Sequence, residues 1–266
     1  MNKNVNEEGC IYGTWEMWDN TWVIAYGKAV YCYLLVGEEK ALLIDTAYGK
    51  GDIRALVEDI TDKPVYVANT HGHFDHTGGN ALWEKVYGSR EAVKDMKKAF
   101  NPDMEAEMKS KPYPDYEIEE IGDGYSFNLG NRRVEVIDIP AHHPGSVAYL
   151  DHGRRLLFSG DEMEAGQVLM FLDKKVTIPA HLENMKKLKK RSEEFDFICP
   201  SHNGLPLNKS YIDDFIGLDT AIMEGNQQVQ ENLAGFGFPP VMGSFFGTHM
   251  NVERAKFGKA SMIYLK

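Results

Sequence analysis

The sequence predicts an α/β fold in which two β-sheets pack together and helices cover their outer faces. Short runs of β-branched and aromatic residues alternate with segments of helical periodicity, and the order strands, helix, strands, helix occurs twice. The chain has 266 residues, 43% of them hydrophobic, which is enough to bury a large core. We expect a single domain over residues 1–266, because α/β domains often reach about 200–250 residues.

The first half of this pattern lies before residue 70. Strands are predicted at residues 21–26, 30–36 and 40–45, separated by Gly-containing turns. Apolar residues then recur at helical spacing in residues 51–61. A short apolar run at residues 64–69 is typical of a buried strand.

The second half begins with an amphipathic helix at residues 89–100. The expected strands are residues 125–129, 132–139, 146–151, 155–159, 195–199 and 261–265. The expected helices are residues 179–190, whose last turn is rich in lysine, and residues 209–233.

Two segments are less regular. Residues 101–120 are polar and contain three prolines, so they form either a lid over a pocket or a solvated connection. Residues 205–266 are expected to be a helical C-terminal extension. Substrate choice would depend on residues 101–120, 162–172 and 235–249, because such loops form pocket walls.

Charge and cysteine content restrict the class of protein. The net charge is -11, which argues against a nucleic-acid partner because a polyanion would be repelled. The three cysteines, Cys10, Cys32 and Cys199, show no CxxC spacing, which favours reduced thiols in the cytoplasm. No signal peptide or membrane span is visible. We expect a small-molecule substrate and no membrane partner, and homo-oligomers stay open.

Residues of the metal-binding type follow four of the predicted strands. The first segment holds a cluster of four such residues within six positions, and each of the other segments holds one. In chain order they are His71, His73, Asp75, His76, His142, Asp161 and His202. If the strands belong to two packed sheets, their ends can converge on one edge.

Imidazole nitrogens and carboxylate oxygens are the ligands that Zn²⁺ prefers, at about 2.0–2.2 Å. In an extended chain, His71 and His73 point to one side, Asp75 continues this alternation and His76 faces the opposite way. One cluster can therefore address two metals. The carboxylate of Asp161 can bridge them, and two metals about 3.5–4 Å apart can activate a water molecule between them.

These motifs resemble those of the metallo-β-lactamase superfamily. Residues 70–76 (THGHFDH) resemble its HxHxDH signature, and residues 140–146, 157–161 and 200–204 resemble its second histidine, bridging-aspartate and last histidine motifs. The resemblance implies an αββα four-layer sandwich with the site on one edge of the two sheets. It assigns His71, His73 and His142 to one metal, Asp75, His76 and His202 to a second, and Asp161 to both.

Further residues are expected near the site. The superfamily motif usually has Thr where His143 stands, so we take His142 as the ligand and His143 as a pocket residue. Asp45 is the last residue of a predicted strand, at a position where such folds often keep a carboxylate that orients a ligating histidine. Thr70 and Ser201 are expected to donate hydrogen bonds nearby. We expect structural roles for His152 and His181 and a surface role for His249.

Rival chemistries fit less well. A serine hydrolase would need a GxSxG elbow, which is missing from the sequence. Di-iron redox members of the superfamily typically have Glu in place of His73. The common β-lactamases have Cys in place of Asp161, and lactonases often have Tyr shortly after it, whereas residues 162–164 are Glu-Met-Glu.

The sequence therefore predicts a metal-dependent hydrolase of ester, thioester or lactone bonds, similar to glyoxalase II-like and lactonase-like members. The expected cofactor is two Zn²⁺ ions, with iron or manganese open. Asp75 is the expected catalytic residue, which orients the water and moves a proton. The alternatives are a phosphodiesterase of the same fold and a non-catalytic metal-binding protein.

Overall fold

The structure is a computed structural model that describes residues 4–7, 10–27, 29–97, 115–173, 175–231 and 252–265. Within these ranges eight consecutive strands form an N-terminal sheet in chain order, antiparallel up to β5 and parallel from β5 to β8. The strands are β1 (Asn4–Glu7), β2 (Cys10–Trp18), β3 (Thr21–Tyr26), β4 (Val30–Val36), β5 (Ala41–Ile44), β6 (Val65–Ala68), β7 (Lys85–Ser89) and β8 (Glu117–Ile121).

Two further sheets follow in the described part of the chain. The central sheet has the order β15-β14-β12-β11-β10-β9, and the C-terminal sheet has the order β13-β18-β17-β16. Their strands are β9 (Ser126–Asn128), β10 (Arg133–Asp138), β11 (Val147–Asp151), β12 (Leu156–Gly160), β13 (Val168–Met170), β14 (Phe197–Pro200), β15 (Leu207–Asn208), β16 (Gln230–Glu231), β17 (Val252–Phe257) and β18 (Ala260–Leu265).

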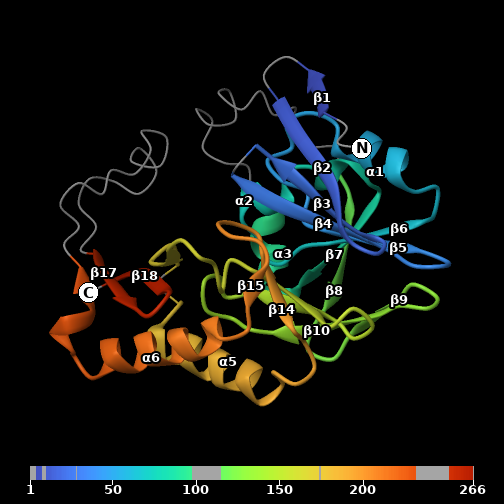
Figure 1. Cartoon of the computed structure of the whole chain (residues 1–266). Coiled ribbons are helices and arrows are strands. Elements are labelled where there is room, and N and C mark those ends of the chain that lie inside the picture. The colour runs from blue at the N-terminus through green and yellow to red at the C-terminus, as the bar shows by residue number, and fades with distance from the viewer. Residues whose placement is uncertain are drawn as a thin grey trace.

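The helices pack on the outer faces of the first two sheets (Figure 1). Helices α1 and α3 cover the N-terminal sheet, and α5 and α6 cover the central sheet. The helical segments are α1 (Ile53–Ile60), α2 (Phe74–Thr77), η1 (Asn80–Leu82), α3 (Arg90–Met96), α5 (Ile178–Lys190), α6 (Tyr211–Met223) and η2 (Gln227–Val229).

Strand β4 shows why the sequence gives four layers. Its side chains alternate, so Tyr33 and Leu35 pack between the two sheets while Cys32 and Leu34 pack toward α1 and α3. Because both faces are buried, nearly every residue of the strand is apolar or aromatic. A third apolar interface joins the central sheet to α5 and α6. The predicted αββα sandwich is therefore confirmed.

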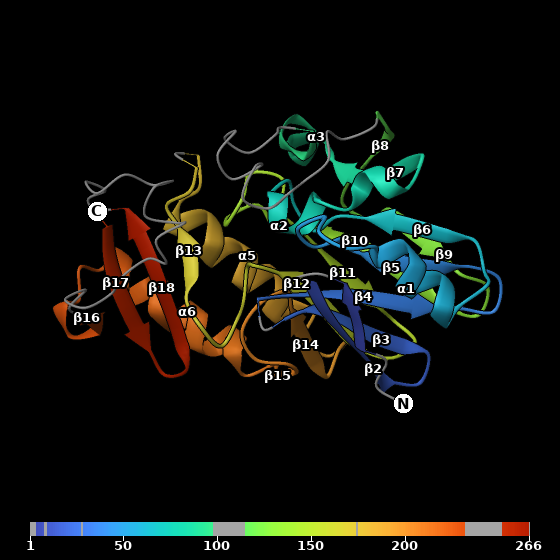
Figure 2. The same cartoon turned by 90° about the horizontal axis from the view of Figure 1, so that it is seen from above.

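The C-terminal sheet was not predicted as a sheet. Figure 2 shows β17 and β18 beside the sandwich and next to α6. Strand β18 confirms the strand predicted at residues 261–265, but β13 and β17 were missed. The prediction that residues 205–266 are helical is thus only partly right, because the described part contains both α6 and strands β15 to β18.

The helix predicted at residues 209–233 was too long. Helix α6 ends at Met223, and Gly225 follows with a φ of 70°. The amide of Asn226 donates to the carbonyl of Ala221 at 2.9 Å, a bond that closes the helix through a left-handed glycine. Val229, which lies beyond this point, therefore belongs to a separate element, η2.

The N-terminal half also differs from the prediction. Strands β1 and β2 were missed, and β8 overlaps the end of the segment predicted as a lid. Of the predicted lid at residues 101–120, residues 101–114 lie outside the described residues. No helix in the described part of the chain is long and apolar enough to cross a membrane.

A buried arginine ties the two sheets of the sandwich together. The guanidinium of Arg132 donates to a carboxylate oxygen of Asp151 at 2.7 Å within the central sheet. It also donates to the carbonyl of Asn20 and the hydroxyl of Thr21, each at 2.7 Å, at the start of β3. The side chains of Arg132 and Asp151 are fully buried, so their charges depend on each other.

We predict that Arg132→Met lowers the free energy of unfolding by about 3–5 kcal/mol, because it leaves the buried carboxylate of Asp151 without its partner. Urea unfolding followed by circular dichroism measures this. The control is Arg133→Met, whose side chain is 60% exposed and which should change stability by less than about 0.5 kcal/mol. Equal effects of the two substitutions would contradict the role given to Arg132.

Candidate metal centre

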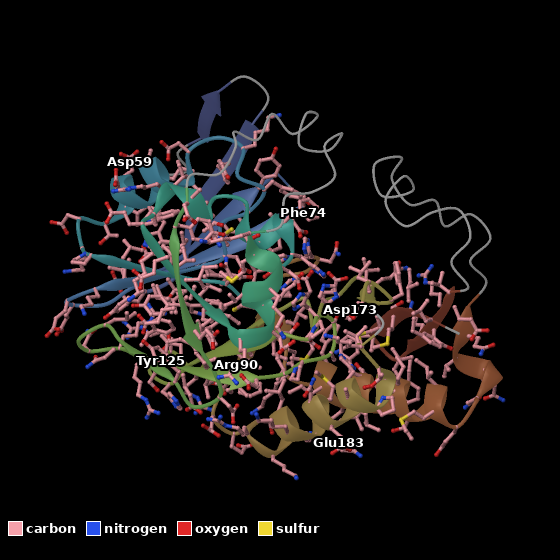
Figure 3. The ribbon with its side chains drawn as sticks, turned by 180° about the vertical axis from the view of Figure 1, so that it is seen from behind. Asp59, Phe74, Arg90, Tyr125, Asp173 and Glu183 are labelled. Atoms are coloured by element: carbon pink, nitrogen blue, oxygen red, sulfur yellow. The ribbon has the colours of Figure 1, made fainter. Side chains whose placement is uncertain are left out.

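Four strand ends meet at one edge of the sandwich. Strand β6 of the N-terminal sheet leads into His71, while β10, β12 and β14 of the central sheet lead into His142, Asp161 and His202. The end of β12 lies very close to the segment that follows β6, because a Cβ atom on Gly160 would lie 2.8 Å from the Cβ atom of Thr70. Glycine therefore lets β12 deliver Asp161 beside the His71 loop. Phe74 and Asp173 lie on the side of the sandwich that faces β17 and β18 (Figure 3).

The first group of possible ligands consists of His71, His73 and His142, whose ligand atoms all lie within 4.8 Å of one another. Nδ1 of His73 lies 2.9 Å from Nε2 of His71 and 3.0 Å from Nε2 of His142. The Nδ1 atom of His142 lies 3.0 Å from the carbonyl oxygen of Leu169, so it carries the proton. Its Nε2 lone pair therefore faces the other two rings.

The second group consists of Asp75, His76 and His202, whose ligand atoms also lie within 4.8 Å of one another. Asp75 lies 3.6 Å from Nε2 of His76 and 3.4 Å from Nε2 of His202. The other ring nitrogen of His202 contacts the carbonyl oxygen of Ala29. As in the first group, a backbone carbonyl fixes which nitrogen faces the centre.

Asp161 connects the two groups. Its Oδ2 atom lies 3.4 Å from Nε2 of His76, 3.3 Å from Nε2 of His202 and 3.6 Å from Nε2 of His142. One carboxylate oxygen therefore touches ring nitrogens of both groups, as expected of a bridging ligand.

The structure differs from the sequence prediction in the geometry of Asp75. We predicted an extended chain in which Asp75 follows the side of His73 and His76 faces away. Residues 74–77 instead form α2, because the carbonyl of His73 accepts the amides of His76 and Thr77, each at 3.1 Å. The helical turn brings Asp75 and His76 into the same group.

The residues present fit metal ions. Nε2 of His76 and Oδ1 of Asp161 are buried and have no hydrogen-bond partner among the described residues. A buried polar atom without a partner costs free energy, which coordination to a cation would offset. The donor set of imidazole nitrogens and carboxylate oxygens is the one that Zn²⁺ binds, although iron and manganese accept similar ligands.

Burial and neighbouring charges set the protonation of these groups. Burial lowers the pKa of His71 and His73 well below the usual range and that of His142 to about 4. At His76 and His202 burial acts the same way, but the carboxylates of Asp161 and Asp75 raise both pKa values well above the usual range. The first group is therefore neutral at pH 7, and a cation in the second would displace protons.

The buried carboxylate of Asp45 contacts three residues around the candidate metal centre. One oxygen of its carboxylate accepts the amide of Thr70 at 2.8 Å. The other accepts the hydroxyls of Thr70 at 2.8 Å and Ser201 at 3.2 Å, and it lies 2.9 Å from Nδ1 of His76. The structure thus brings together the three supporting residues expected from the sequence.

His143 lies beside the first group but is not part of it. Its Nε2 atom lies 3.0 Å from a carboxylate oxygen of Asp95, and its Nδ1 atom accepts the amide of Gly145 at 2.9 Å. Both ring nitrogens are thus used away from the centre, in keeping with the choice of His142 as the ligand. His249 lies outside the described residues.

Sequence reasoning placed residues 162–172 in a pocket wall but did not predict that the two acids after Asp161 are buried. Glu162 and Glu164 are buried, and burial raises the pKa of each to about 7. His181, expected to be structural, lies 2.7 Å from Asp219 and 2.9 Å from the carbonyl oxygen of Glu162, and is fully buried. The only sequence signal for a role of Glu162 was its position next to the candidate ligand Asp161. A sequence does not show whether a glutamate is buried or exposed.

Both the sequence and the fold of this chain are similar to those of known proteins. The sequence model of a family described as the metallo-beta-lactamase superfamily matches residues 25–216, more than half of the chain. Human "Acyl-coenzyme A thioesterase MBLAC2" is 26% identical over 174 residues, which cover 55% of this chain and 62% of that protein. "Hydroxyacylglutathione hydrolase" of Anaeromyxobacter dehalogenans is 30% identical over 139 residues, which cover 52% of this chain and 48% of that protein.

The matched region thus spans about half to three fifths of these curated relatives. Among solved structures, the metallo-beta-lactamase superfamily protein ST1585 from Sulfolobus tokodaii superposes with a TM-score of 0.56 at 19% identity, covering 82% of this chain and 88% of that one. A metallo-beta-lactamase from Cronobacter sakazakii gives a TM-score of 0.59 at 20% identity, covering 81% of this chain and 94% of that one. At such identities these structures support the fold alone.

We predict that Asp45→Asn weakens Zn²⁺ binding about 10- to 100-fold, because the ring of His76 loses its charged partner. Competition with a chromophoric chelator measures the dissociation constants. Asp62→Asn, at an exposed position outside the centre, is the matched control and should bind as the unsubstituted protein does. Unchanged binding by Asp45→Asn would show that this carboxylate does not support the ligands.

A second prediction concerns pH and the fully buried His181. Burial opposes protonation, but the carboxylate of Asp219 raises the pKa of His181 to about 9, above about 6.5 in the unfolded chain. The stabilisation is therefore complete below pH 6.5 and is lost as pH rises toward 9. Urea unfolding of the metal-free protein should show stability falling over this interval, and His181→Gln should reduce that slope. His152→Gln, at a partly exposed ring, should leave the slope in place.

Proposed function

The chain belongs to the metallo-beta-lactamase superfamily, and from that premise we propose that it is a metal-dependent hydrolase of ester, thioester or lactone bonds. The observation that carries the proposal is the position of Asp161, whose one carboxylate oxygen lies 3.3–3.6 Å from ring nitrogens of both ligand groups. Such an arrangement suits a pair of cations. We further propose that residues 1–266 act as one domain, in which β13 and the segment before it form one wall of the pocket.

Thioesters are the favoured substrates within this class. The two relatives described above are named as hydrolases of acyl groups carried by coenzyme A and by glutathione, and both carriers are thiols. The Glu-Met-Glu sequence after Asp161 departs from the Tyr that lactonases often have there. A thioester is therefore the first substrate to test and a lactone the second.

In this proposal His71, His73 and His142 would hold one ion, Asp75, His76 and His202 would hold the other, and Asp161 would serve both. Two zinc ions would supply Lewis acidity, which lowers the pKa of water and polarises a carbonyl oxygen. Burial keeps the three histidines of the first group neutral at pH 7, whereas His76 and His202 would release protons when an ion binds. His142 and His202 point their Nε2 atoms inward because Leu169 and Ala29 hold their Nδ1 atoms.

Asp75 is the proposed catalytic residue. Burial opposes its ionisation, but the imidazoles of His76 and His202 lower its pKa to about 2, so the carboxylate is ionised at pH 7. An ionised carboxylate only accepts hydrogen bonds, so Asp75 would hold a water molecule by one of its hydrogens. It would then receive that proton when the water attacks and pass it to the leaving group.

We expect purified protein to contain close to two metal ions per chain and to hydrolyse acyl thioesters. Chelation should abolish turnover, and added Zn²⁺ should restore it. Asp161→Asn should lower kcat/KM at least about 100-fold, because losing a shared ligand removes several kcal/mol of transition-state stabilisation. Asp196→Asn, at an exposed carboxylate paired with Arg155, is the matched control.

The outcome separates the candidate functions. Mass spectrometry counts and identifies the metals, and a panel of thioesters, lactones, simple esters and phosphodiesters defines the reaction. Turnover of phosphodiesters alone would replace the proposal with a phosphodiesterase. Two bound metals without turnover of any substrate would favour a metal-binding protein.

A further inference from the structure

The residues that follow Asp161 contact both of the other central-sheet loops that carry ligands. These residues, Glu162, Met163 and Glu164, form what we call the acidic segment. It leaves the end of β12 and runs between the loop of His142 and the loop of His202. Its two acids point to different loops, so the contacts of each can be followed separately.

Glu162 contacts the His142 loop. Its Oε1 atom accepts the amide of Ala141 at 3.1 Å and the amide of His142 at 2.7 Å. Both bonds go to the backbone, so they fix the position of the loop directly. The side chain of Glu162 is fully buried, and a hydrogen bond shielded from water is stronger than the same bond in water.

Glu164 contacts the His202 loop. Its Oε2 atom accepts the side-chain amide of Asn203 at 3.0 Å, and the next residue, Ala165, donates its backbone amide to the carbonyl of Asn203 at 2.8 Å. A Cβ atom on Gly166 would lie 2.5 Å from the Asn203 side chain. The acidic segment and the two residues after it are thus in direct contact with the His202 loop, at the residue that follows the candidate ligand His202.

The acidic segment is itself held in place. Met163 is fully buried in the core under α5 and α6, and its carbonyl accepts the hydroxyl of Ser159 at 3.3 Å. The carbonyl of Glu162 lies 2.9 Å from Nε2 of His181, whose other nitrogen lies 2.7 Å from Asp219 on α6. A segment anchored in this way can transmit position to the loops on either side.

We propose that Glu162 and Glu164 are positioning residues that each hold one ligand loop against Asp161. Glu162 sets the position of His142 and hence the first group, and Glu164 sets the position of His202 and hence the second. This inference rests on the proposed function, because it takes the two groups as metal sites. It assigns different metal sites to two acids that are two residues apart.

Zinc titration of the full metal-free chain tests this without substrate. Two backgrounds each leave one group intact: His202→Ala keeps the first group, and His142→Ala keeps the second. Glu162→Leu and Glu164→Leu are introduced into both, and a chromophoric chelator reports the dissociation constant of the tighter remaining Zn²⁺ ion. Glu183→Leu, at an exposed acid of α5, is the matched control.

With His202→Ala, we expect Glu162→Leu to weaken Zn²⁺ binding about tenfold or more and Glu164→Leu to change it by less than about threefold. With His142→Ala, the two effects should exchange. Glu162→Gln and Glu164→Gln keep an acceptor oxygen and should restore most of the lost affinity. A substitution that only loosens the fold would weaken binding in both backgrounds alike.

Equal losses in both backgrounds, or no loss in either, would overturn the inference. If the Glu162→Leu protein does not fold, Glu162→Asp, which shortens the side chain, must show the same selectivity for the inference to stand. If the Glu164→Leu protein does not fold, Asn203→Ala, which removes the exposed partner of Glu164, must show the selectivity expected of Glu164→Leu. If zinc loss is selective but no substrate is turned over, the proposed hydrolase is excluded and the positioning roles stand. If a substrate is turned over but zinc loss is unselective, the positioning roles are excluded and the hydrolase stands.

Discussion

The carboxylate of Asp45 is the contact on which the rest of the centre depends. It binds Thr70 at the end of β6 and Ser201 at the end of β14, so it joins the two sheets at the edge where the ligands meet. It also lies 2.9 Å from Nδ1 of His76, which fixes that ring. Asp45 has a φ of 63°, an uncommon conformation for a non-glycine residue that the surrounding bonds maintain. Fold and site therefore share one buried group.

The centre brings imidazole nitrogens and carboxylate oxygens close together, so bound protons or metal ions are needed to balance the carboxylate charges. Nε2 of His76 and Oδ1 of Asp161 are buried without a hydrogen-bond partner in the described ranges, while the opposite ring nitrogens of His76, His142 and His202 each contact a fixed oxygen. The side chains are thus oriented by the protein before any ion enters. Preorganisation of this kind reduces the cost of ordering ligands on binding.

The ligands could be predicted from sequence because each follows a strand, and strand ends converge when two sheets pack face to face. The layers could be predicted because the order strands, helix, strands, helix occurs twice, with turn residues between the strands. The turn of α2 could not be predicted, since it depends on the carbonyl of His73 and not on side-chain pattern. Nor could the burial of Glu162, whose partners are backbone amides 20 and 21 residues away. The C-terminal sheet was hidden because β17 mixes charged and apolar residues.

Buried charge in this chain occurs where separate elements must be joined. Arg132 and Asp151 link β3 to the central sheet, and His181 and Asp219 link α5 to α6. A buried ion pair adds little to stability compared with apolar residues of the same volume, but removing one partner is costly. Such pairs therefore act against alternative packings of the layers. Because the candidate ligands come from both sheets, a small shift between the sheets would separate them, and the buried contact of Arg132 with β3 opposes such a shift.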